Sequence, residues 1–537
     1  MPSVAEHYDI APGGREAEQP YAALDLGSNS FHLIVAYDHG DRLQVVDRHK
    51  EMVRLAEGLK VDNTLSAAVA ARAIACLERL GQRIRDLPPG NVRVVGTNTL
   101  RRARNSQDFI EAAERALGHR VEIISGREEA RLIYLGVSHS LEPIEDNAES
   151  RLVVDIGGGS TELILGRQFQ PHLMESLYMG CVSMSEAFFG DRKLLEHRFR
   201  DAENAARQEL EVLEEIYRAR GWDTVIGASG SILAIHDAIL ELTGERGITH
   251  DGLATLKGHL LEKGDINDVG LEAIDAERAP VFPGGLAITA AVVDALDIDS
   301  MTVSDGALRE GLLHDLLGRV HAQDIREATV ADLMQRYHVD ARHARRVAGT
   351  VARILEQVSW DLAENLAGQR GPNGLGASSP SGGLNGTPGS LSGAAAARLL
   401  RWAALLHEIG MDIAHSQYHK HGGYLLDNMD LPGFSRPEQH NLSMIVRSHR
   451  RKFPIEELDG SPGLIALCVL LRLAVVLHRG RTENTLPAFW VAPTGVGEVR
   501  ITFPRKWLAE HPLTKLDLEQ ESEYLSVIPL KLSVAAV

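Results

Sequence analysis

The sequence predicts an α/β protein with two similar lobes, followed by a helical region and a small C-terminal domain. The first observation behind this prediction is a repeat, because residues 22–38 (AALDLGSNSFHLIVAYD) and 152–168 (LVVDIGGGSTELILGRQ) share one pattern. The second is the alternation of strand-like and helical segments that follows each copy. The third is length, since 537 residues are enough for about three or four domains of roughly 100–200 residues.

The elements of the first lobe, residues 21–137, follow from local patterns. Three strand-like runs open it as a meander, and apolar residues three and four apart then predict a long helix. Strands and helices alternate after that. The predicted strands are 21–26, 31–37, 42–47, 92–96 and 121–125, and the predicted helices are 65–87, 106–117 and 127–137.

The second copy of the motif belongs to a second lobe, residues 138–319. Segment 304–319 is expected to carry the chain out of this lobe. Further strands are predicted at 224–228 and 301–305, and helices at 203–219, 229–242 and 284–296.

The rest of the chain is predicted to be mainly helical. Residues 320–485 are rich in helical patterns and histidine, and residues 486–537 contain strand-like runs typical of a small α+β domain. Residues 368–393 are rich in Gly, Pro and Ser with a single charge, which predicts a flexible insert.

The composition excludes several classes of protein. The net charge of −18 argues against a generally basic nucleic-acid binder, although not against a local basic groove. Three cysteines without a C-x-x-C pair argue against a disulfide framework and fit a reducing compartment. Residues 1–20 lack a secretory pattern, and the apolar run 464–478 is short and interrupted by Arg472. We therefore expect a cytoplasmic protein with a disordered tail and no transmembrane segment.

Each copy of the repeat predicts a β-hairpin whose turn wraps a phosphate. Glycine permits close backbone approach, and successive N–H groups and hydroxyls form an anion-binding concavity. Asp25 and Asp155, at the strand ends, are suited to hold Mg²⁺; the alternative for either alone is that it caps its own turn. We expect two facing half-sites with Gly27, Ser28, Asn29, Ser30, Gly157, Gly158, Gly159, Ser160 and Thr161 as phosphate ligands.

Two further strand–turn–helix segments add candidate phosphate ligands. GTNTLRRARN (96–105) places Thr97 and Arg101 at a helix N-terminus, with a solvated basic turn as the alternative. VIGASGSILAI (225–235) offers Gly227, Ser229, Gly230 and Ser231 to a phosphate or a nucleoside, with a simple capped turn as the alternative.

Adjacent acids in ISGREEARLI (124–133) offer a catalytic base. Glu128 is explained by a capping box with Ser125 and by the helix dipole. This explains one of the two acids, and a second Glu facing the phosphate site is a candidate general base toward a water molecule. Glu162 shares a face with Ser160 by strand alternation, so it is placed to orient water or metal.

Taken together, these segments resemble the exopolyphosphatase/guanosine pentaphosphate phosphohydrolase family of the actin/sugar-kinase/Hsp70 superfamily. The matching stretches between residues 21 and 319 are LDLGSNSFHLIV, VGTNTLRRARN, IISGREEARLIYLGV, VVDIGGGSTELIL, MGCVSMSEAFF, GASGSI, FPGGLAI and SDGALREG. The downstream helical part looks like that of long proteobacterial exopolyphosphatases. The resemblance implies two actin-like (ribonuclease H-like) lobes with the active site in the cleft, an all-α HD-like domain and a small C-terminal α+β domain.

The resemblance also implies an activity, namely Mg²⁺-dependent release of terminal orthophosphate from inorganic polyphosphate, with Mn²⁺ as an alternative metal. By motif, Glu129 matches the catalytic base, Asp25, Asp155 and Glu162 match the metal and water site, and Arg101 matches a phosphate ligand. A homodimer that grips long chains is implied, with a peripheral place at the inner membrane as an alternative location. The nearest alternative substrate is a guanosine penta- or tetraphosphate. An ATP-binding actin-like kinase or ATPase and a non-catalytic polyphosphate sensor are the rivals from other classes.

The helical region carries two polar clusters of its own. In 405–423 the pair His407–Glu408 stands where HD-type phosphohydrolases have His-Asp. Carboxylate and imidazole together suit a metal, but this departure favours an inactive structural remnant. The basic run 447–452 either lines a polyanion path or is a solvated surface.

Overall fold

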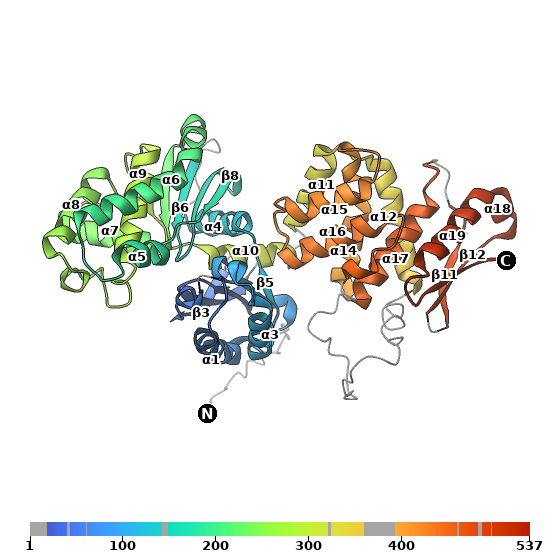
Figure 1. Cartoon of the computed structure of the whole chain (residues 1–537), viewed down its shortest axis with the longest axis horizontal. Helices are drawn as coiled ribbons and strands as arrows, with labels where there is room; N and C mark the ends of the chain where they lie inside the picture. Colours follow the sequence, from blue (N-terminus) through green and yellow to red (C-terminus); the bar gives the residue numbers. More distant parts are fainter. Residues whose placement is uncertain are drawn as a thin grey trace, which may run out of the picture. The chain divides into compact units, whose positions relative to one another are not determined.

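The computed structural model describes residues 19–39, 43–60, 62–141, 149–320, 324–358, 393–458, 461–481, 486–495 and 497–537. The chain divides into two compact units, residues 1–323 and 324–537 (Figure 1). The expected tail, apart from its last two residues, and the expected insert, apart from Gly393, lie outside the described residues. Within the described part of the chain, no helix is long and apolar enough to cross a membrane.

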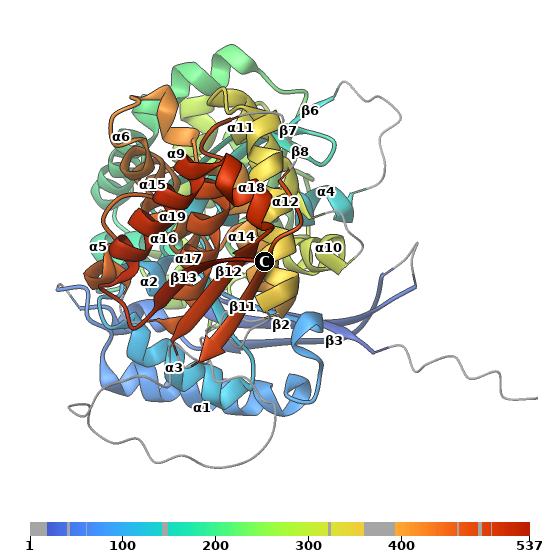
Figure 2. The same ribbon diagram turned by 90° about the vertical axis from the view of Figure 1, so that its right-hand side faces the viewer.

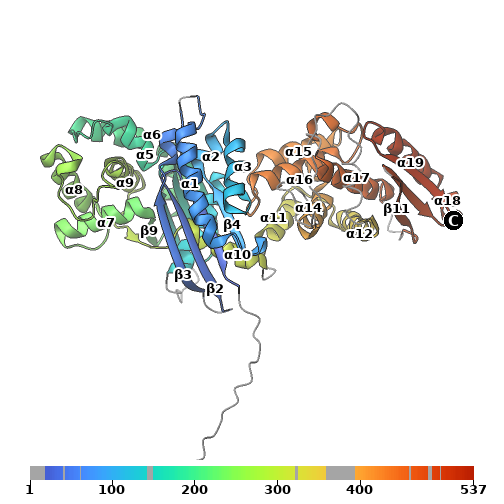
Figure 3. The same ribbon diagram turned by 90° about the horizontal axis from the view of Figure 1, so that it is seen from below.

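The first unit contains two five-stranded sheets with the same topology. The strand orders are β3-β2-β1-β4-β5 and β8-β7-β6-β9-β10, each with an antiparallel meander and two parallel additions. The long strands β2 and β3 run side by side in Figure 3. This equivalence confirms the α/β class and the duplication predicted from the repeat. The strands are β1 (Tyr21–Leu26), β2 (Ser30–Asp38), β3 (Leu43–Met52), β4 (Val92–Gly96), β5 (Val121–Ile123), β6 (Ser150–Ile156), β7 (Thr161–Arg167), β8 (Gln170–Leu177), β9 (Thr224–Ala228) and β10 (Thr302–Val303).

Helices cover one face of each sheet with a separate apolar core. The first sheet is covered by α1 (Ala67–Ile84) and α3 (Ser106–Leu117), and Figure 2 shows α1 on the opposite side of the strands from α10. The second sheet packs against α5 (Cys181–Phe189), α6 (Glu196–Arg220), α7 (Ser229–Thr243), α8 (His250–Lys263) and α9 (Phe282–Leu296). The sequence patterns missed β8, α5 and α8, whereas the helix predicted at 106–117 is confirmed residue for residue.

Two helices lie between the sheets and join them. Helices α4 (Gly126–Ser140) and α10 (Leu308–Val320) share one core with strands of both sheets. In this core the carboxylate of Asp315 accepts hydrogen bonds from Arg93 and Arg131, both at 2.5 Å. Helix α4 ends at Ser140, three residues after the predicted helix end at 137, and segment 304–319 also packs against the first sheet as it leads out of the second lobe.

The second unit consists of helices and a small sheet around one apolar core. The apolar run forms the buried helix α17 (Pro462–Leu477), whose Arg472 binds the carboxylate of Glu521 in the interior. Helix α19 (Pro512–Leu525) packs against β13 (Lys531–Ala536), and β11 (Trp490–Gly495) pairs with β12 (Glu498–Phe503). The other elements are α11 (Ile325–Arg336), α12 (Ala341–Val358), α14 (Gly393–Leu406), α15 (Tyr418–Asn428), α16 (Arg436–Ser448) and α18 (Arg505–Glu510).

Candidate active site

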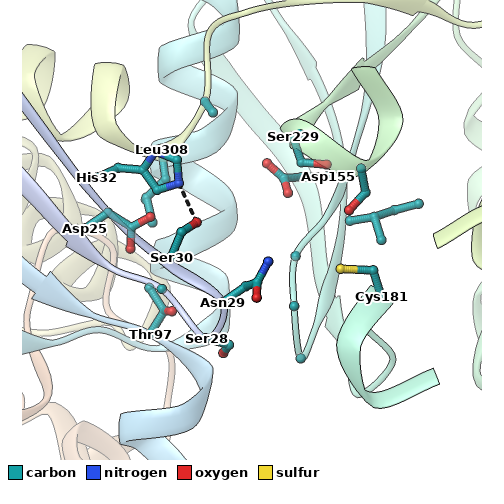
Figure 4. A pocket seen from close by; sticks show the side chains of 18 of the residues that line it. Asp25, Ser28, Asn29, Ser30, His32, Thr97, Asp155, Cys181, Ser229 and Leu308 are labelled. Atoms are coloured by element: carbon teal, nitrogen blue, oxygen red, sulfur yellow. Dashed lines mark hydrogen bonds between the residues drawn. The ribbon is translucent and has the colours of Figure 1, made fainter. Parts of the chain in front are cut away.

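A cavity of about 180 Å³ in the first unit is lined by both copies of the repeated motif. In Figure 4, Asp25 and Thr97 of the first lobe face Asp155 and Ser229 of the second. Most of the predicted site residues line it: Asp25, Gly27, Ser28, Asn29, Ser30, Thr97, Glu129, Asp155, Gly157, Gly158, Gly159, Ser160, Glu162, Ser229 and Gly230.

The turns of the two hairpins lie against each other. A Cβ atom added to Gly158 would lie 3.2 Å from Cβ of Ser28 and 3.4 Å from Cβ of Asn29. A Cβ on Gly159 would lie 2.9 Å from Oδ1 of Asn98. Glycine at these two positions therefore lets backbone N–H groups of one lobe approach hydroxyl and amide groups of the other.

Helix α5 supports the second turn from behind. The N–H of Cys181 donates to the carbonyl oxygen of Gly157 at 2.9 Å, and that of Val182 to Gly158 at 3.0 Å. Gly180 makes this contact possible, because a Cβ there would lie 2.4 Å from backbone atoms of Gly158 and Gly159. Gly180 and α5 lie in the stretch MGCVSMSEAFF, which resembles the family, but its sequence alone indicates no role in the site.

Buried carboxyl groups form the floor of the cavity. Burial first, and then repulsion by Glu129, raises the pKa of Asp155 to about 7. Burial, Glu129 and Asp155 likewise raise the pKa of Asp25 and of Glu162 well above the ordinary range, although Arg309 lowers the pKa of Asp25 and hydrogen bonds lower that of Glu162. These groups cannot all ionise in a low dielectric without a compensating cation.

The two lobes place different residues opposite their equivalent aspartates. In the antiparallel register Asp155 pairs with Glu162, whereas Asp25 pairs with His32. His32 therefore occupies in the first lobe the position that Glu162 has in the second. The serine of β8, Ser176, donates to Oε1 of Glu162 at 2.7 Å and fixes the direction of that carboxylate.

The two adjacent glutamates of helix α4, Glu128 and Glu129, have different surroundings. Glu128 is structural: its N–H donates to Oγ of Ser125 at 3.1 Å, and its carboxylate accepts from Nε of Arg131 at 2.8 Å. Ser125 thus caps the helix as predicted, but the return contact of a full capping box is replaced by the ion pair. Glu129 lines the cavity instead.

Three predicted phosphate ligands lie outside the cavity lining. Arg101 donates from Nη1 to Oε2 of Glu129 at 2.7 Å, so it contacts the acid rather than the cavity. The hydroxyl of Thr161 donates to the carbonyl oxygen of Met179 at 2.7 Å. A Cβ on Gly227 would lie 2.4 Å from Cγ2 of Ile232, so glycine is required there by packing. The sequence pattern alone does not distinguish these roles from phosphate binding.

Sequence reasoning missed the cations at the cavity wall, which are Lys50, Arg278 and Arg309. Burial, and then the neighbouring Arg278, lowers the pKa of Lys50. Arg309 lies in SDGALREG, so the family resemblance could have singled it out, but Lys50 and Arg278 belong to no motif. The candidate Ser231 also lines the cavity, and the other unassigned lining residues are His32, Met52, Asn98, Ile133, Ile156, Cys181, Glu277, Val281, Ala307 and Leu308.

His32 sets the direction of the hydroxyl of Ser30. Nη1 of Arg309 lies 3.1 Å from Nδ1 of His32, and because a guanidinium only donates, Nδ1 accepts and Nε2 carries the proton. Nε2 then donates to Oγ of Ser30 at 2.7 Å. Burial, followed by the charge of Arg309, lowers the pKa of His32 to about 3, so the ring is neutral. The hydroxyl proton of Ser30 is therefore available to a phosphate oxygen.

Two orphaned polar atoms at the cavity fit a phosphate and a cation. Oγ of Ser229 and Oδ1 of Asp25 are buried, and no other described residue hydrogen-bonds to either atom. Ser229 also has φ +82°, a strained conformation for a residue with a side chain. It stands at the N-terminus of α7, a position that favours anions.

The carboxyl groups on the cavity floor suit Mg²⁺, an ion that keeps water and phosphate ligands, better than a metal ion that protein groups alone coordinate. The carboxylates of Asp25, Asp155 and Glu162 do not form a group of three with oxygens within 4.8 Å of one another, in the part of the chain that the structure describes. An ion there would take one or two carboxylates and complete its shell with water and phosphate oxygens. This is the usual coordination of Mg²⁺ beside phosphorylated ligands.

Comparison with known proteins matches both units to one family. The model of the Ppx/GppA phosphatase family matches residues 33–320, and that of Ppx/GppA phosphatase, domain III, matches residues 325–372 and 386–522. An exopolyphosphatase from Cytophaga hutchinsonii has the same fold over 56% of this chain and 98% of its own, with a TM-score of 0.51 and 23% identity.

Curated relatives align over almost the whole chain. A guanosine-5'-triphosphate,3'-diphosphate pyrophosphatase of Aeromonas hydrophila subsp. hydrophila is 39% identical over 94% of this chain and 96% of its own. The protein of that name from Pseudoalteromonas translucida is 37% identical over 96% of this chain and 98% of its own. The chain therefore belongs to the Ppx/GppA phosphatase family, and the prediction of an enzyme, a hydrolase acting on phosphoanhydride bonds, is confirmed.

Proposed function

We propose that this protein hydrolyses the terminal 5' phosphoanhydride bond of guanosine 5'-triphosphate,3'-diphosphate and releases orthophosphate. The observation that carries this proposal is the alignment with pyrophosphatases named for that nucleotide, at 37–39% identity over nearly full length. It favours the alternative substrate of the sequence analysis over inorganic polyphosphate, which the motifs suggested first.

The charge distribution of the cavity supports a phosphoanhydride substrate. Acidic groups form the floor, whereas Lys50, Arg278 and Arg309 line the wall. A terminal phosphoryl group bound between them meets donors on one side and the base on the other. The arrangement offsets the net charge of −18 locally, so an acidic protein is able to admit a polyanion.

Hydroxyl and backbone donors hold the phosphoryl group. Ser30 offers its proton because His32 already fills one acceptor position of its oxygen. Ser28 is placed in the same way, since its Oγ accepts from the hydroxyl of Thr99 at 2.8 Å. The N–H groups of the turn at 157–160 complete the cradle. Donors fixed before the reaction stabilise the charge that develops on the phosphoryl oxygens.

Glu129 acts as the general base in this proposal. Its carboxylate lines the cavity and is held by Arg101, which leaves one oxygen for an attacking water. Asp25, Asp155 and Glu162 would hold Mg²⁺, which when bound offsets charge on the phosphate oxygens. The water oxygen bonds to the terminal phosphorus, its proton passes to Glu129, and the phosphoanhydride oxygen departs with guanosine 5'-diphosphate,3'-diphosphate.

Inorganic polyphosphate is the second candidate substrate. Among the described residues, no Phe, Tyr or Trp lines the cavity, so no aromatic ring is present to stack on a guanine. The hydrogen-bond donors of the cavity are suited to bind phosphate. The same chemistry applies to any chain with a terminal phosphoanhydride. A homodimer, implied earlier by resemblance, is a further expectation that light scattering checks.

The test is orthophosphate release, with Mg²⁺, from the guanosine pentaphosphate, long-chain polyphosphate and ATP in parallel. We expect the highest kcat/KM for the guanosine nucleotide. Glu129→Gln should lower kcat by ~10²–10⁴-fold, as expected for loss of a general base. Glu78→Gln, on the exposed face of α1, is the matched control. A higher kcat/KM for polyphosphate would make polyphosphate the substrate instead. Near wild-type turnover by Glu129→Gln would contradict the assignment of Glu129 as the general base.

A further inference from the structure

Three side chains in the second unit point their ligand atoms at one place. His343 of α12, His407 and Glu408 each offer one nitrogen or oxygen, and these atoms lie within 4.8 Å of one another. Nε2 of His343 and Nε2 of His407 are each 3.8 Å from Oε1 of Glu408. Among the described residues, no other group of three or more His, Cys, Asp or Glu meets that distance.

The backbone fixes the tautomer of the central imidazole. Nδ1 of His407 lies 2.8 Å from the carbonyl oxygen of Ala404, which only accepts, so Nδ1 carries the proton and Nε2 presents a lone pair. His407 is fully buried, and none of the described residues hydrogen-bonds to its Nε2. A backbone acceptor behind an imidazole is the usual support for a metal-binding histidine.

A second imidazole at this cluster repeats the arrangement. Nδ1 of His449 bonds to the carbonyl oxygen of Val446, and its Nε2 is buried without a partner in the described chain. The rings of His449 and His407 have centroids 5.4 Å apart. A buried acceptor that is left unpaired costs free energy, so two such nitrogens side by side call for a ligand.

The electrostatics suit a cation with nitrogen ligands. The imidazole of His407 is fully buried and presents an unpaired Nε2 to the cluster. The carboxylate of Glu408 is also buried and bonds to the guanidinium of Arg481. The side chain of Arg481 is 43% exposed, so it is able to leave the carboxylate without losing a buried position.

We propose that His343, His407 and Glu408 bind one first-row transition-metal ion such as Zn²⁺. Two imidazoles and one carboxylate form a donor set typical of zinc sites that keep an open position. Imidazole nitrogen favours such an ion over Mg²⁺. His343, Glu408 and His449 line a cavity of about 220 Å³, which gives the ion a route in and room for a further ligand. The sequence-based preference for a structural remnant is thereby replaced.

The site makes Arg481 a competitor of the ion, because both bind the same carboxylate. Arg481→Gln should therefore strengthen metal binding, whereas a merely structural cluster, in which the guanidinium replaces the ion, would gain nothing. Arg479→Gln is the matched control, since Arg479 lines the same cavity but pairs with Asp517.

The experiment measures metal content and Co²⁺ absorption of the full chain. Purified protein, stripped with a chelator and dialysed against Zn²⁺, should retain about one equivalent by elemental analysis, and Co²⁺ should give a visible ligand-field spectrum. His407→Asn and Glu408→Gln should each lower affinity by at least ~10-fold, while Arg481→Gln should raise it and Arg479→Gln should leave it unchanged. Circular dichroism confirms that each variant is folded.

Two outcomes would overturn the proposal. One is a folded wild type that retains no Zn²⁺, Co²⁺, Mn²⁺ or Ni²⁺. The other is metal bound with equal affinity by the wild type and the folded Glu408→Gln and His407→Asn variants. Because Mg²⁺-dependent phosphate release belongs to the first unit, this result is independent of the proposed function.

Discussion

Arg101 and Glu129 form an ion pair in which Nη1 lies 2.7 Å from Oε2, and the same nitrogen donates to the carbonyl oxygen of Ile124 at 3.0 Å. One guanidinium thus ties the proposed base to the strand end that precedes its helix. The pair is largely buried, with side chains 17% and 10% exposed. We therefore propose that Arg101 positions the proposed base rather than binding phosphate.

Arg101→Lys should lower kcat with little change in KM. Lysine keeps the charge, but its side chain is shorter and more flexible, so its ammonium group does not hold a nitrogen at the position of Nη1, which donates to both oxygens. We expect ~10–100-fold lower kcat, in line with effects of residues that orient a catalytic group. Steady-state kinetics with the preferred substrate measure this. Arg102→Lys, exposed on the same helix α2 (Asn98–Arg102), serves as control, and a rise in KM alone would instead make Arg101 a substrate ligand.

The raised carboxyl pKa values predict that the stability of the protein falls as pH rises. The pKa of Asp155 is about 7 in the folded protein against an ordinary 3.8, so the folded state binds the proton more tightly. The free energy of unfolding then decreases with pH between these two values, and the loss is complete above about 7.

Mg²⁺ should reverse this loss, because a cation offsets the charge of the ionised carboxylates. Thermal unfolding scanned from pH 4 to pH 8 should show a larger Mg²⁺-induced rise in Tm at pH 8 than at pH 5. Asp155→Asn should flatten the pH dependence and reduce the Mg²⁺ effect. An equal Mg²⁺ effect at both pH values in the wild type would argue against a metal at these carboxylates.

Many strands and helices could be predicted because local sequence patterns determine them. The strand Tyr21–Leu26 and the helix Ser106–Leu117 were found at their true bounds, since apolar periodicity and flanking turns fix such elements. The place of helix α10 could not be predicted in this way. Only long-range contacts, in which its Asp315 binds Arg93 and Arg131, place it between the sheets.

The residues of the candidate site likewise divide into those that local sequence predicts and those that only the tertiary structure brings to the cavity. Gly158 and Ser28 could be predicted because both lie in a visible repeat, and the turn chemistry is local. Lys50 and Arg278 could not, because strand pairing and a loop far along the chain bring them to the cavity. Thr161 and Gly227 were predicted for their residue type, yet a hydrogen bond and side-chain packing explain them.

Gly180→Ala should displace the turn at 157–160 and impair phosphate binding. The added Cβ would lie 2.4 Å from backbone atoms of Gly158 and Gly159, too close for any relaxation short of moving the turn. We expect KM for the nucleotide to rise, with lower thermal stability of about 1–3 kcal/mol from overpacking. Gly258→Ala is the control, because nothing lies within 4 Å of its Cβ position. An unchanged KM in a folded Gly180→Ala protein would contradict the role of α5 in shaping the turn.

Asp315→Asn tests whether the buried ion cluster joins the two sheets. Burial alone would raise the pKa of Asp315, but Arg131, Arg93 and Arg319 outweigh it and hold the pKa below the ordinary range. Removing the carboxylate leaves the guanidinium groups of Arg93 and Arg131 buried without their common partner. Loss of one member of a buried ion pair costs about 3–5 kcal/mol.

The sign of the pH dependence distinguishes this effect from a general packing defect. A depressed carboxyl pKa contributes stability above the ordinary value of 3.8 that disappears as pH falls through the folded value. The wild type should therefore lose more stability than Asp315→Asn when denaturant unfolding is compared between pH 7 and pH 3. Asp299→Asn, at an exposed position, should behave as the wild type. Parallel curves for wild type and Asp315→Asn would mean that the cluster contributes packing alone, and that apolar contacts of α4 and α10 hold the sheets together.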